Sequence, residues 1–175
     1  IKIYQNKKNS GYGEGFSKAF MKSKMPVVIT LHSDLQFDLI NFSKKNKQMI
    51  YYCIKNNINI FPKRVKREFL SNVRSFILRI ILSVINFVKV IDFNGHPKFL
   101  IKDHFKNIKN YPKNFTFDFC LYLWLIKNNE KINSSLVSSE NKRLFGQTSW
   151  DKGIIKQINF LLKFLKEIEI FKKNF

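Results

Sequence analysis

The stretch that most constrains the fold is a short apolar run that ends abruptly in polar residues. Residues 27–31 read Val-Val-Ile-Thr-Leu, and the polar side chains that follow are His32, Ser33, Asp34, Gln36 and Asp38. Such a run predicts a strand that is buried on both faces. In an open α/β sheet, ligands bind where strands of this kind end. Asp34 and Gln36 are therefore candidate ligands of a divalent cation, although an ordinary polar turn fits the same residues.

Hydrophobic periodicity predicts helices and strands along the rest of the chain. A glycine-rich turn at residues 9–15 is expected to open a helix. Its spacing matches neither the dinucleotide fingerprint nor a P-loop, and a tight connection explains its glycines as well as phosphate binding does. Helices are predicted at residues 39–47, 65–91, 120–127 and 154–175, strands at 49–54 and 131–137, and an apolar run stands at 99–101.

Residues 65–91 form the longest predicted helix. Val73, Phe76 and Ile80 recur on one side at a spacing of three to four residues, and serines and arginines fall on the other side. We expect the apolar side to pack chiefly on the protein's own sheet, as most amphipathic helices do. That side is also wide enough for a second surface. No run of about 18 uninterrupted apolar residues occurs, so no membrane-spanning helix is predicted.

The chain is strongly basic, with 32 Lys and Arg residues against 12 Asp and Glu residues and a formal net charge of +20. Such a charge calls for polyanionic partners: a nucleotide, a nucleic acid or an anionic membrane surface. Lysines far outnumber arginines and accompany many asparagines and isoleucines, which is typical of an AT-rich genome, so part of the charge is background. Cys53 and Cys120 form no CxxC pair, which predicts buried, reduced thiols in a cytoplasmic protein.

The polar group after residues 27–31 resembles the Asp-x-Asp-x-Gln segment of family 2 glycosyltransferases of the polyprenyl-phosphate sugar synthase type. Asp34 matches the second aspartate and Gln36 matches the glutamine, whereas His32 stands in place of the first aspartate. The resemblance implies that Asp34 and Gln36 hold Mg²⁺ or Mn²⁺, with His32 beside the donor phosphates. A neutral imidazole adds no negative charge to such a site.

Residues 92–98, Asp-Phe-Asn-Gly-His-Pro-Lys, form a second cluster with the composition of an irregular active-site loop. They resemble the Asp-x-Asn-Gly-x-Pro-Lys variant of the family segment Asp-x-x-x-Gly-x-Arg, in which Asp92 matches the aspartate and Lys98 the cation. Asp118 matches the aspartate of a family Phe-x-x-Asp segment, although it fits equally well as an acid in the first turn of a helix. The resemblance implies acceptor-site or catalytic roles for Asp92 and Asp118.

Basic residues in two further segments complete the resemblance. Arg64 and Arg67 stand in the basic segment that the family places near the donor diphosphate, and Arg143 opens a segment similar to the family's Arg-x-x-Gly-x-Ser. Guanidinium groups suit phosphate because they donate two parallel hydrogen bonds. The resemblance therefore implies that Arg64, Arg67, Lys98 and Arg143 contact the donor phosphates. A solvated basic helix start explains Arg64 and Arg67 equally well.

Taken together, the resemblance implies an α/β fold that is GT-A-like, Rossmann-like, with a mostly parallel sheet flanked by helices. Residues 1–153 are expected to be a partial catalytic domain that lacks its first βα units, since the chain starts at Ile1 in what resembles mid-sheet sequence. Such a fragment is expected to be poorly active by itself. Residues 154–175 are expected to form a basic amphipathic helix. The implied activity is transfer of a sugar from a nucleotide-sugar to an acceptor such as a polyprenyl phosphate. This activity would serve cell-envelope glycan or glycolipid synthesis at the cytoplasmic face of the inner membrane, with peripheral membrane contact.

Two alternatives remain. The net charge of +20 and the aromatic content also fit a nucleic-acid-binding protein without catalysis. The aromatic residues fall at core spacing, however, and no recognised RNA- or DNA-binding motif is present. An inactive relative of the transferases is the other alternative, because His32 replaces an acid of the metal motif.

Overall fold

The computed structural model describes residues 11–31, 39–65, 69–134, 137–138 and 153–173. The helices are α1 (Tyr12–Lys22), α2 (Leu39–Asn56), α3 (Phe69–Asn86), α4 (Phe117–Lys127) and α5 (Ile154–Lys172), with a short 3₁₀ helix η1 (Lys102–Phe105). The strands are β1 (Val27–Thr30), β2 (Ile58–Ile60), β3 (Lys63–Arg64), β4 (Lys98–Ile101), β5 (Lys131–Asn133) and β6 (Val137–Ser138). The chain is therefore α/β, as predicted.

The main sheet is mixed, so the expectation of a mostly parallel sheet is wrong. Its strand order is β1-β4-β2-β5, and β4 runs antiparallel to both of its neighbours. β2 and β5 pair in parallel, so β1, β2 and β5 all point in one direction. β1 confirms the predicted strand, but it is the outermost described strand and not an internal one. The pairing partner of a strand is set by residues far away in the chain, here by residues 98–101, and the apolar run itself carries no signal for it.

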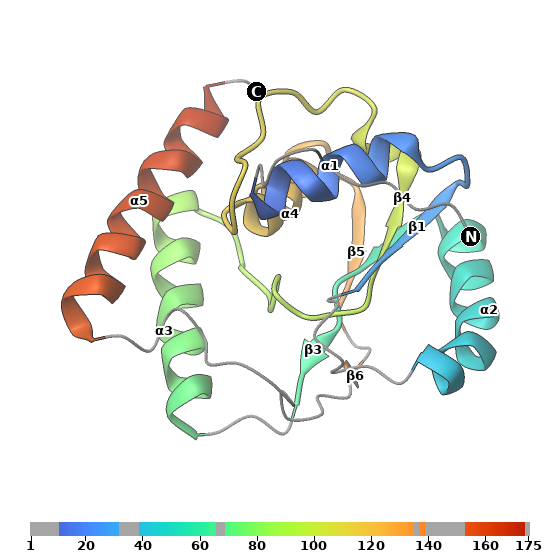
Figure 1. Ribbon diagram of the computed structural model, residues 1–175, viewed down its shortest axis with the longest axis horizontal. Coiled ribbons are helices and arrows are strands. Elements are labelled where there is room, and N and C mark those ends of the chain that lie inside the picture. Colours follow the sequence, from blue (N-terminus) through green and yellow to red (C-terminus); the bar gives the residue numbers. More distant parts are fainter. Residues whose placement is uncertain (1–10, 32–38, 66–68, 135–136, 139–152, 174–175) are drawn as a thin grey trace.

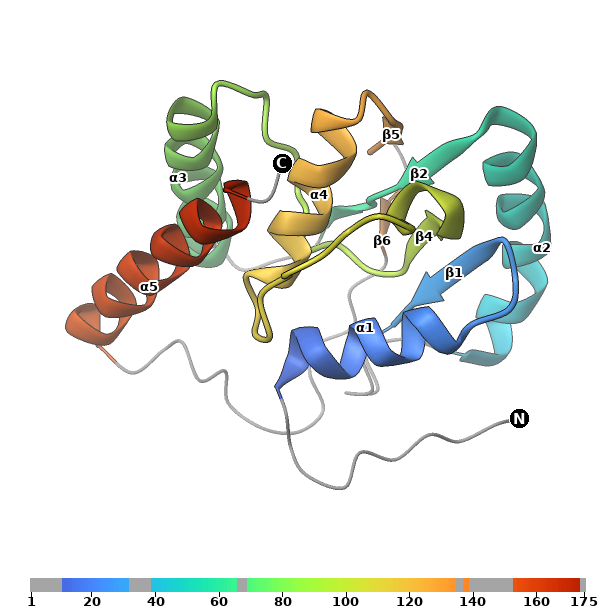
Figure 2. The same cartoon turned by 90° about the horizontal axis from the view of Figure 1, so that it is seen from above.

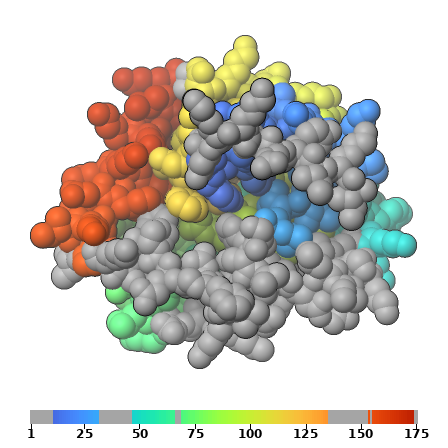
Figure 3. Space-filling model, viewed as in Figure 1, coloured from blue at the N-terminus to red at the C-terminus, as the bar shows by residue number. Residues whose placement is uncertain are grey.

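The elements form layers around this sheet (Figures 1 and 2). α2 covers one face, and α1 and α4 cover the other. α3 and α5 lie side by side beyond α4, on the opposite flank of the molecule from α2. In the space-filling view α5 and α2 likewise occupy opposite flanks (Figure 3).

The alternation of side chains along β4 divides the core into two parts. Phe99 and Ile101 point toward α2 and pack with residues such as Cys53. Leu100 points the other way, into the larger cluster formed with α1, α4 and α5. All four residues of β4 are buried, so this strand is the centre of the fold.

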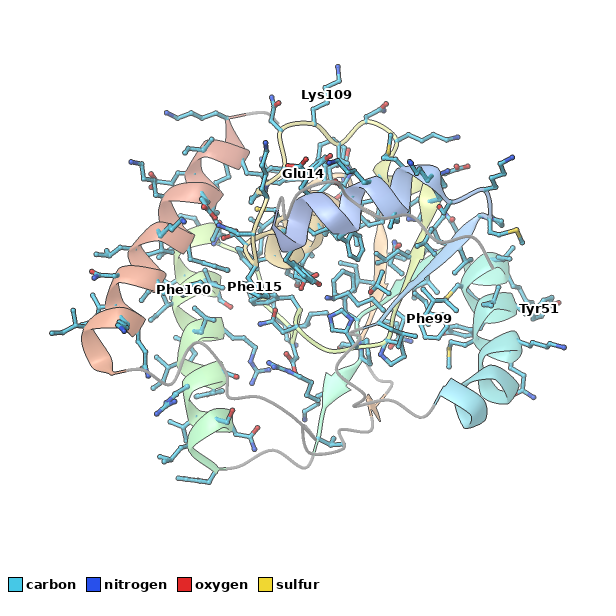
Figure 4. The ribbon with its side chains drawn as sticks, in the orientation of Figure 1. Glu14, Tyr51, Phe99, Lys109, Phe115 and Phe160 are labelled. Atoms are coloured by element: carbon cyan, nitrogen blue, oxygen red, sulfur yellow. The ribbon has the colours of Figure 1, made fainter. Side chains whose placement is uncertain are left out.

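Residues 49–54 are helical, so the predicted strand there is wrong. They belong to α2, whose side chains at Met49, Ile50 and Cys53 pack against the sheet. Tyr51 points away from the sheet on the outer side of α2, whereas Phe99 lies between β4 and this helix (Figure 4). The spacing of the buried residues is helical, and packing on the sheet outweighs the β propensity of the tyrosines and isoleucines.

α3 confirms a helix within residues 65–91, but the expectation for its apolar side is wrong. Phe76, Ile80 and Val84 are exposed, at 55%, 47% and 66% of their full surface. Leu82 is the buried residue of this helix, and Ser75 and Ser83 lie on the half-buried side. The broader apolar stripe thus faces outward and the narrower one faces the core.

The remaining elements follow the predictions with shifted boundaries. α1 begins at Tyr12, within the glycine-rich segment of residues 9–15, so Gly13 and Gly15 belong to the helix. α4 begins at Phe117, three residues before its predicted start. Residues 131–137 contribute to two short strands, β5 and β6, in different sheets. α5 confirms the predicted C-terminal helix and buries Phe164, Ile168 and Phe171 in the larger core cluster. Both cysteines are buried and free, as predicted.

Candidate functional site

The chain reversals around the main sheet bring several predicted site residues to one edge. The carboxyl ends of β1, β2 and β5 meet at this edge, and β4, which runs in the opposite direction, begins there. Thr30, the last residue of β1, pairs directly with Lys98, the first residue of β4. Ligands of open α/β sheets bind at the carboxyl ends of their parallel strands. This edge is therefore the natural place for a functional site.

Lys98 and Asp118 form a buried ion pair at this edge. Lys98 stands two residues before Leu100 on β4, so its side chain points to the same face, toward α4. Its Nζ lies 2.7 Å from Oδ1 of Asp118, in the first turn of α4, and the Lys98 side chain has no exposed surface. The hydroxyl of Tyr12 on α1 donates to Oδ2 of the same carboxylate at 3.0 Å. Nε2 of His96 lies 3.0 Å from Nζ, so α1, β4 and α4 are joined by one polar network.

The electrostatics of this network follow from its burial. Burial lowers the pKa of Lys98, and the charge of Asp118 and its hydrogen bond with Lys98 partly oppose this shift. Burial chiefly, and then the charge of Asp118, raises the pKa of the Tyr12 hydroxyl, which therefore remains a hydrogen-bond donor. Both carboxylate oxygens of Asp118 are thus occupied by partners within the protein.

Arg64 and Asp92 form a second ion pair, nearer to the surface. The guanidinium Nη2 and Nε of Arg64 donate to the carboxylate at 2.8 and 3.0 Å, and the backbone N–H of Arg64 donates to Oδ2 at 3.1 Å. This geometry is bidentate and holds the planar guanidinium in one orientation. The two side chains keep 18% and 12% of their surface exposed, so the pair borders solvent.

A groove of about 380 Å³ opens beside this second pair. Its polar lining residues are Lys63, Arg64, Asn72, Ser75, Arg79 and Asp92. Val73 and Phe76 of α3 form its apolar side and continue onto the exposed face of that helix. The guanidinium of Arg79 lies 5.8 Å from the ring centre of Phe76. The groove therefore joins a basic, phosphate-compatible lining to an apolar surface.

Four predicted site residues, Arg64, Asp92, Lys98 and Asp118, are brought together at the sheet edge. The other five lie outside the described residues: His32, Asp34, Gln36, Arg67 and Arg143. Among the residues that the structure describes, no three His, Cys, Asp or Glu side chains gather into a metal-binding group.

Two glycines at the start of α1, Gly11 and Gly13, contact the protein's own backbone. The amide of Gly13 donates to the carbonyl of Lys113 at 2.8 Å, and a Cβ on Gly13 would lie 2.2 Å from the carbonyl oxygen of Pro112. Gly11 has φ of +93°, which favours glycine. A close backbone connection thus explains these glycines.

Sequence reasoning missed Tyr12, His96 and Arg79. His96 stands within the 92–98 cluster, two residues before Lys98. Because side chains two residues apart in a strand point to the same face, the sequence could have predicted that His96 and Lys98 lie together. Arg79 was visible only as a polar residue on a helix, and Tyr12 carried no signal, because its partner Asp118 is 106 residues away.

Comparison with known proteins leaves the chain without an assigned family. No protein-family model, no curated protein and no solved structure matches it. The resemblance to family 2 glycosyltransferases consequently rests on the sequence motifs alone.

Proposed function

We propose that this chain is a glycosyltransferase that uses a nucleotide-sugar donor and a GT-A-like, Rossmann-like fold. The observation that carries the proposal is the meeting of Arg64, Asp92, Lys98 and Asp118 in two ion pairs at one sheet edge. The resemblance had assigned these residues to one site although they come from three separate segments. The same edge is where β1 leads toward Asp34, a predicted metal ligand.

The groove supports a role in binding the donor diphosphate. Asp92 holds the guanidinium of Arg64 at its rim, and Lys63 and Arg79 add two further cations. Basic groups held in advance stabilise the charge that develops on a leaving nucleoside diphosphate. Mg²⁺ or Mn²⁺ held by Asp34 and Gln36 would supply Lewis-acid stabilisation of the same charge. We assign Asp92 to the orientation of Arg64, because its carboxylate is engaged by that side chain.

The roles of the inner pair are constrained by its burial. Lys98 was expected to contact donor phosphates, and Asp118 to have an acceptor-site or catalytic role. Their charged atoms face each other inside the protein in the described structure. We therefore propose that Lys98 and Asp118 stabilise the structure beneath the site without contacting the ligand. Arg64, which lines the groove, is the residue that contacts the ligand.

The outward apolar face of α3 favours a lipid-linked acceptor such as a polyprenyl phosphate. α3 is long and apolar enough to cross a membrane by length and composition, and 6% of it is buried. Its only charged residues are Arg74 and Arg79, both positive, and the basic groove opens beside it. A phosphate in the groove with a polyprenyl chain along α3 would satisfy both surfaces. We accordingly propose peripheral contact with an anionic membrane at its cytoplasmic face.

The test is glycosyl transfer by the purified chain. Nucleotide-sugars labelled in the sugar would be supplied with extracted polyprenyl phosphates and either Mg²⁺ or Mn²⁺, and label in the lipid fraction would be counted. Arg64→Lys should lower turnover, since a lysine cannot reproduce the bidentate contact with Asp92. Lys106→Met, which breaks an exposed ion pair with Asp103, is the matched control. Transfer that is equally fast in Arg64→Lys and in the wild type would refute the proposed role of the groove.

The net charge of +20 favours one other function, nucleic-acid binding without catalysis. Random single-stranded oligonucleotides would then bind with a steep salt dependence that Asp34→Asn and Arg64→Lys leave unchanged. Transferase activity that depends on Arg64, together with weak oligonucleotide binding at 150 mM salt, would reject this alternative.

A further inference from the structure

His96 lies between two polar partners at the sheet edge. It is 4% exposed, and its Nε2 lies 3.0 Å from Nζ of Lys98. Its Nδ1 lies 3.2 Å from the carbonyl oxygen of Thr30 and 3.4 Å from the hydroxyl of the same residue. His96 thus links the Lys98–Asp118 pair to the last residue of β1.

These contacts determine the protonation of the imidazole. The Lys98 ammonium, paired with Asp118, only donates hydrogen bonds, so Nε2 of His96 must accept. A carbonyl oxygen only accepts, so Nδ1 carries the ring proton and donates to Thr30. A second proton would set an N–H group against the ammonium and add a buried positive charge. These contacts therefore fit a neutral imidazole that is protonated on Nδ1.

The loop that contains His96 is held at three points. At its start, Asp92 is held by the guanidinium and the backbone N–H of Arg64. In its middle, Gly95 lies so close to the carbonyl of Pro62 that a Cβ there would be 1.6 Å from the oxygen. At its end, His96 is held by Thr30 and Lys98. The first and third attachments are made by side chains.

We propose that His96 is a positioning residue that fixes the loop of residues 92–97, so that Asp92 orients the guanidinium of Arg64 in the groove. His96 itself does not border the groove, and it acts through Asp92. The consequence for ligand binding rests on the proposed function, whereas the positioning of Asp92 does not.

The first experiment needs no ligand. The backbone N–H of Arg64 donates to Asp92, so its hydrogen exchange relative to that of a core amide reports whether Asp92 stays in place. His96→Leu should raise the ratio of the Arg64 exchange rate to the core-amide exchange rate about tenfold, because it removes the polar contacts of the ring with Lys98 and Thr30. His96→Gln should stay within about threefold, since its amide again offers one acceptor and one donor. Leu125→Ala, in the core two turns along α4 from Asp118, destabilises the fold without touching the loop and should not raise the ratio.

The second experiment measures the function. Binding of inorganic pyrophosphate with Mn²⁺ should weaken about tenfold in His96→Leu, stay within about threefold in His96→Gln and remain unchanged in Leu125→Ala. Nitrogen-15 spectra of the wild-type ring should show a proton on Nδ1 from pH 6 to pH 8. If His96→Leu fails to fold, these spectra and the His96→Gln variant test the positioning role of His96.

The outcomes separate the two proposals. An unchanged Arg64 exchange ratio in folded His96→Leu would overturn the positioning role, as would a ring proton on Nε2. Wild-type protein that does not bind pyrophosphate, but in which the Arg64 amide responds as expected, would refute the donor site alone.

Discussion

The two ion pairs of the site differ in what surrounds each carboxylate. Asp118 accepts from Lys98 and Tyr12 inside the protein, whereas Asp92 holds Arg64 at the rim of a groove. A buried pair contributes little net stability, but either partner left alone is costly. Each member of the inner pair therefore requires the other, whereas the outer pair borders the groove.

This difference yields a prediction for the inner pair. Lys98→Met should lower the free energy of unfolding by about 3–5 kcal/mol, because it leaves the Asp118 carboxylate buried without its cation. The double variant Lys98→Met/Asp118→Leu should recover most of that loss. Urea unfolding monitored by circular dichroism measures both values. Lys106→Met, in an exposed pair, should cost less than about 1 kcal/mol; losses that simply add in the double variant would contradict the account.

The buried cysteines carry a prediction about reactivity. Burial raises the pKa of the Cys53 thiol to about 11 and that of Cys120 well above its ordinary value. At pH 8 the thiolate of native Cys53 should be about 100-fold scarcer than in the unfolded chain. Iodoacetamide labelling, followed by mass spectrometry with and without urea, should therefore be slow in the native protein.

The same shift makes stability depend on pH in a defined direction. The unfolded thiol loses its proton first, so the contribution of Cys53 to stability declines as pH rises from 9.0 toward about 11. If iodoacetamide labelled Cys53 in the native protein as fast as in urea, the thiol would not be buried and neither prediction would hold.

At the scale of elements, α3 is inverted relative to an ordinary surface helix. Its outward residues include Phe69, Phe76 and Val84, and its inward side carries serines. Exposed apolar patches are typical of surfaces that contact a partner protein or a membrane. The exposed residues Ile155, Ile158 and Leu162 add a second apolar surface on α5, the helix beside it (Figure 1).

We expect α3 to hold the protein on anionic lipid. The triple variant Phe76→Gln/Ile80→Gln/Val84→Gln should bind vesicles of phosphatidylglycerol and phosphatidylcholine at least about tenfold more weakly, since each large apolar side chain contributes roughly 1.5–3 kcal/mol when buried. Cosedimentation measures the affinity. Tyr51→Gln/Ile54→Gln, on the exposed side of α2 at the opposite flank, is the matched control. Equal binding by the triple variant and the wild type would exclude α3 as the contact.

At the scale of the whole molecule, the proposed site joins the sheet edge to the segment that follows β1. Asp34→Asn should reduce the increase in nucleoside diphosphate affinity that Mn²⁺ produces, because it removes the acid matched to a metal ligand at constant size. Titrations of UDP and GDP with and without Mn²⁺ measure the effect. Metal-dependent binding that is identical in the variant and the wild type would remove Asp34 from the site.

Much of the fold was predictable from local patterns, and the exceptions share a cause. The apolar run at 27–31, the helix after the glycine-rich turn and the helix at the C-terminus depend on periodicity within a few residues. Whether residues 49–54 form a helix or a strand depends on what they pack against. The side of α3 that faces outward depends on its packing in the same way. For the candidate site, the motifs identified Arg64, Asp92, Lys98 and Asp118, yet not their pairing.

The sequence by itself determined the α/β class and the order of most elements, and it named candidate phosphate ligands, because hydrophobic period and side-chain chemistry are local properties. Only the tertiary structure decided that β4 runs antiparallel between β1 and β2. This reversal places Lys98 beside Thr30 and opposite Asp118, where burial turns a predicted phosphate ligand into half of an internal ion pair. Strand direction and burial depend on contacts between residues far apart in the chain, which no local pattern records.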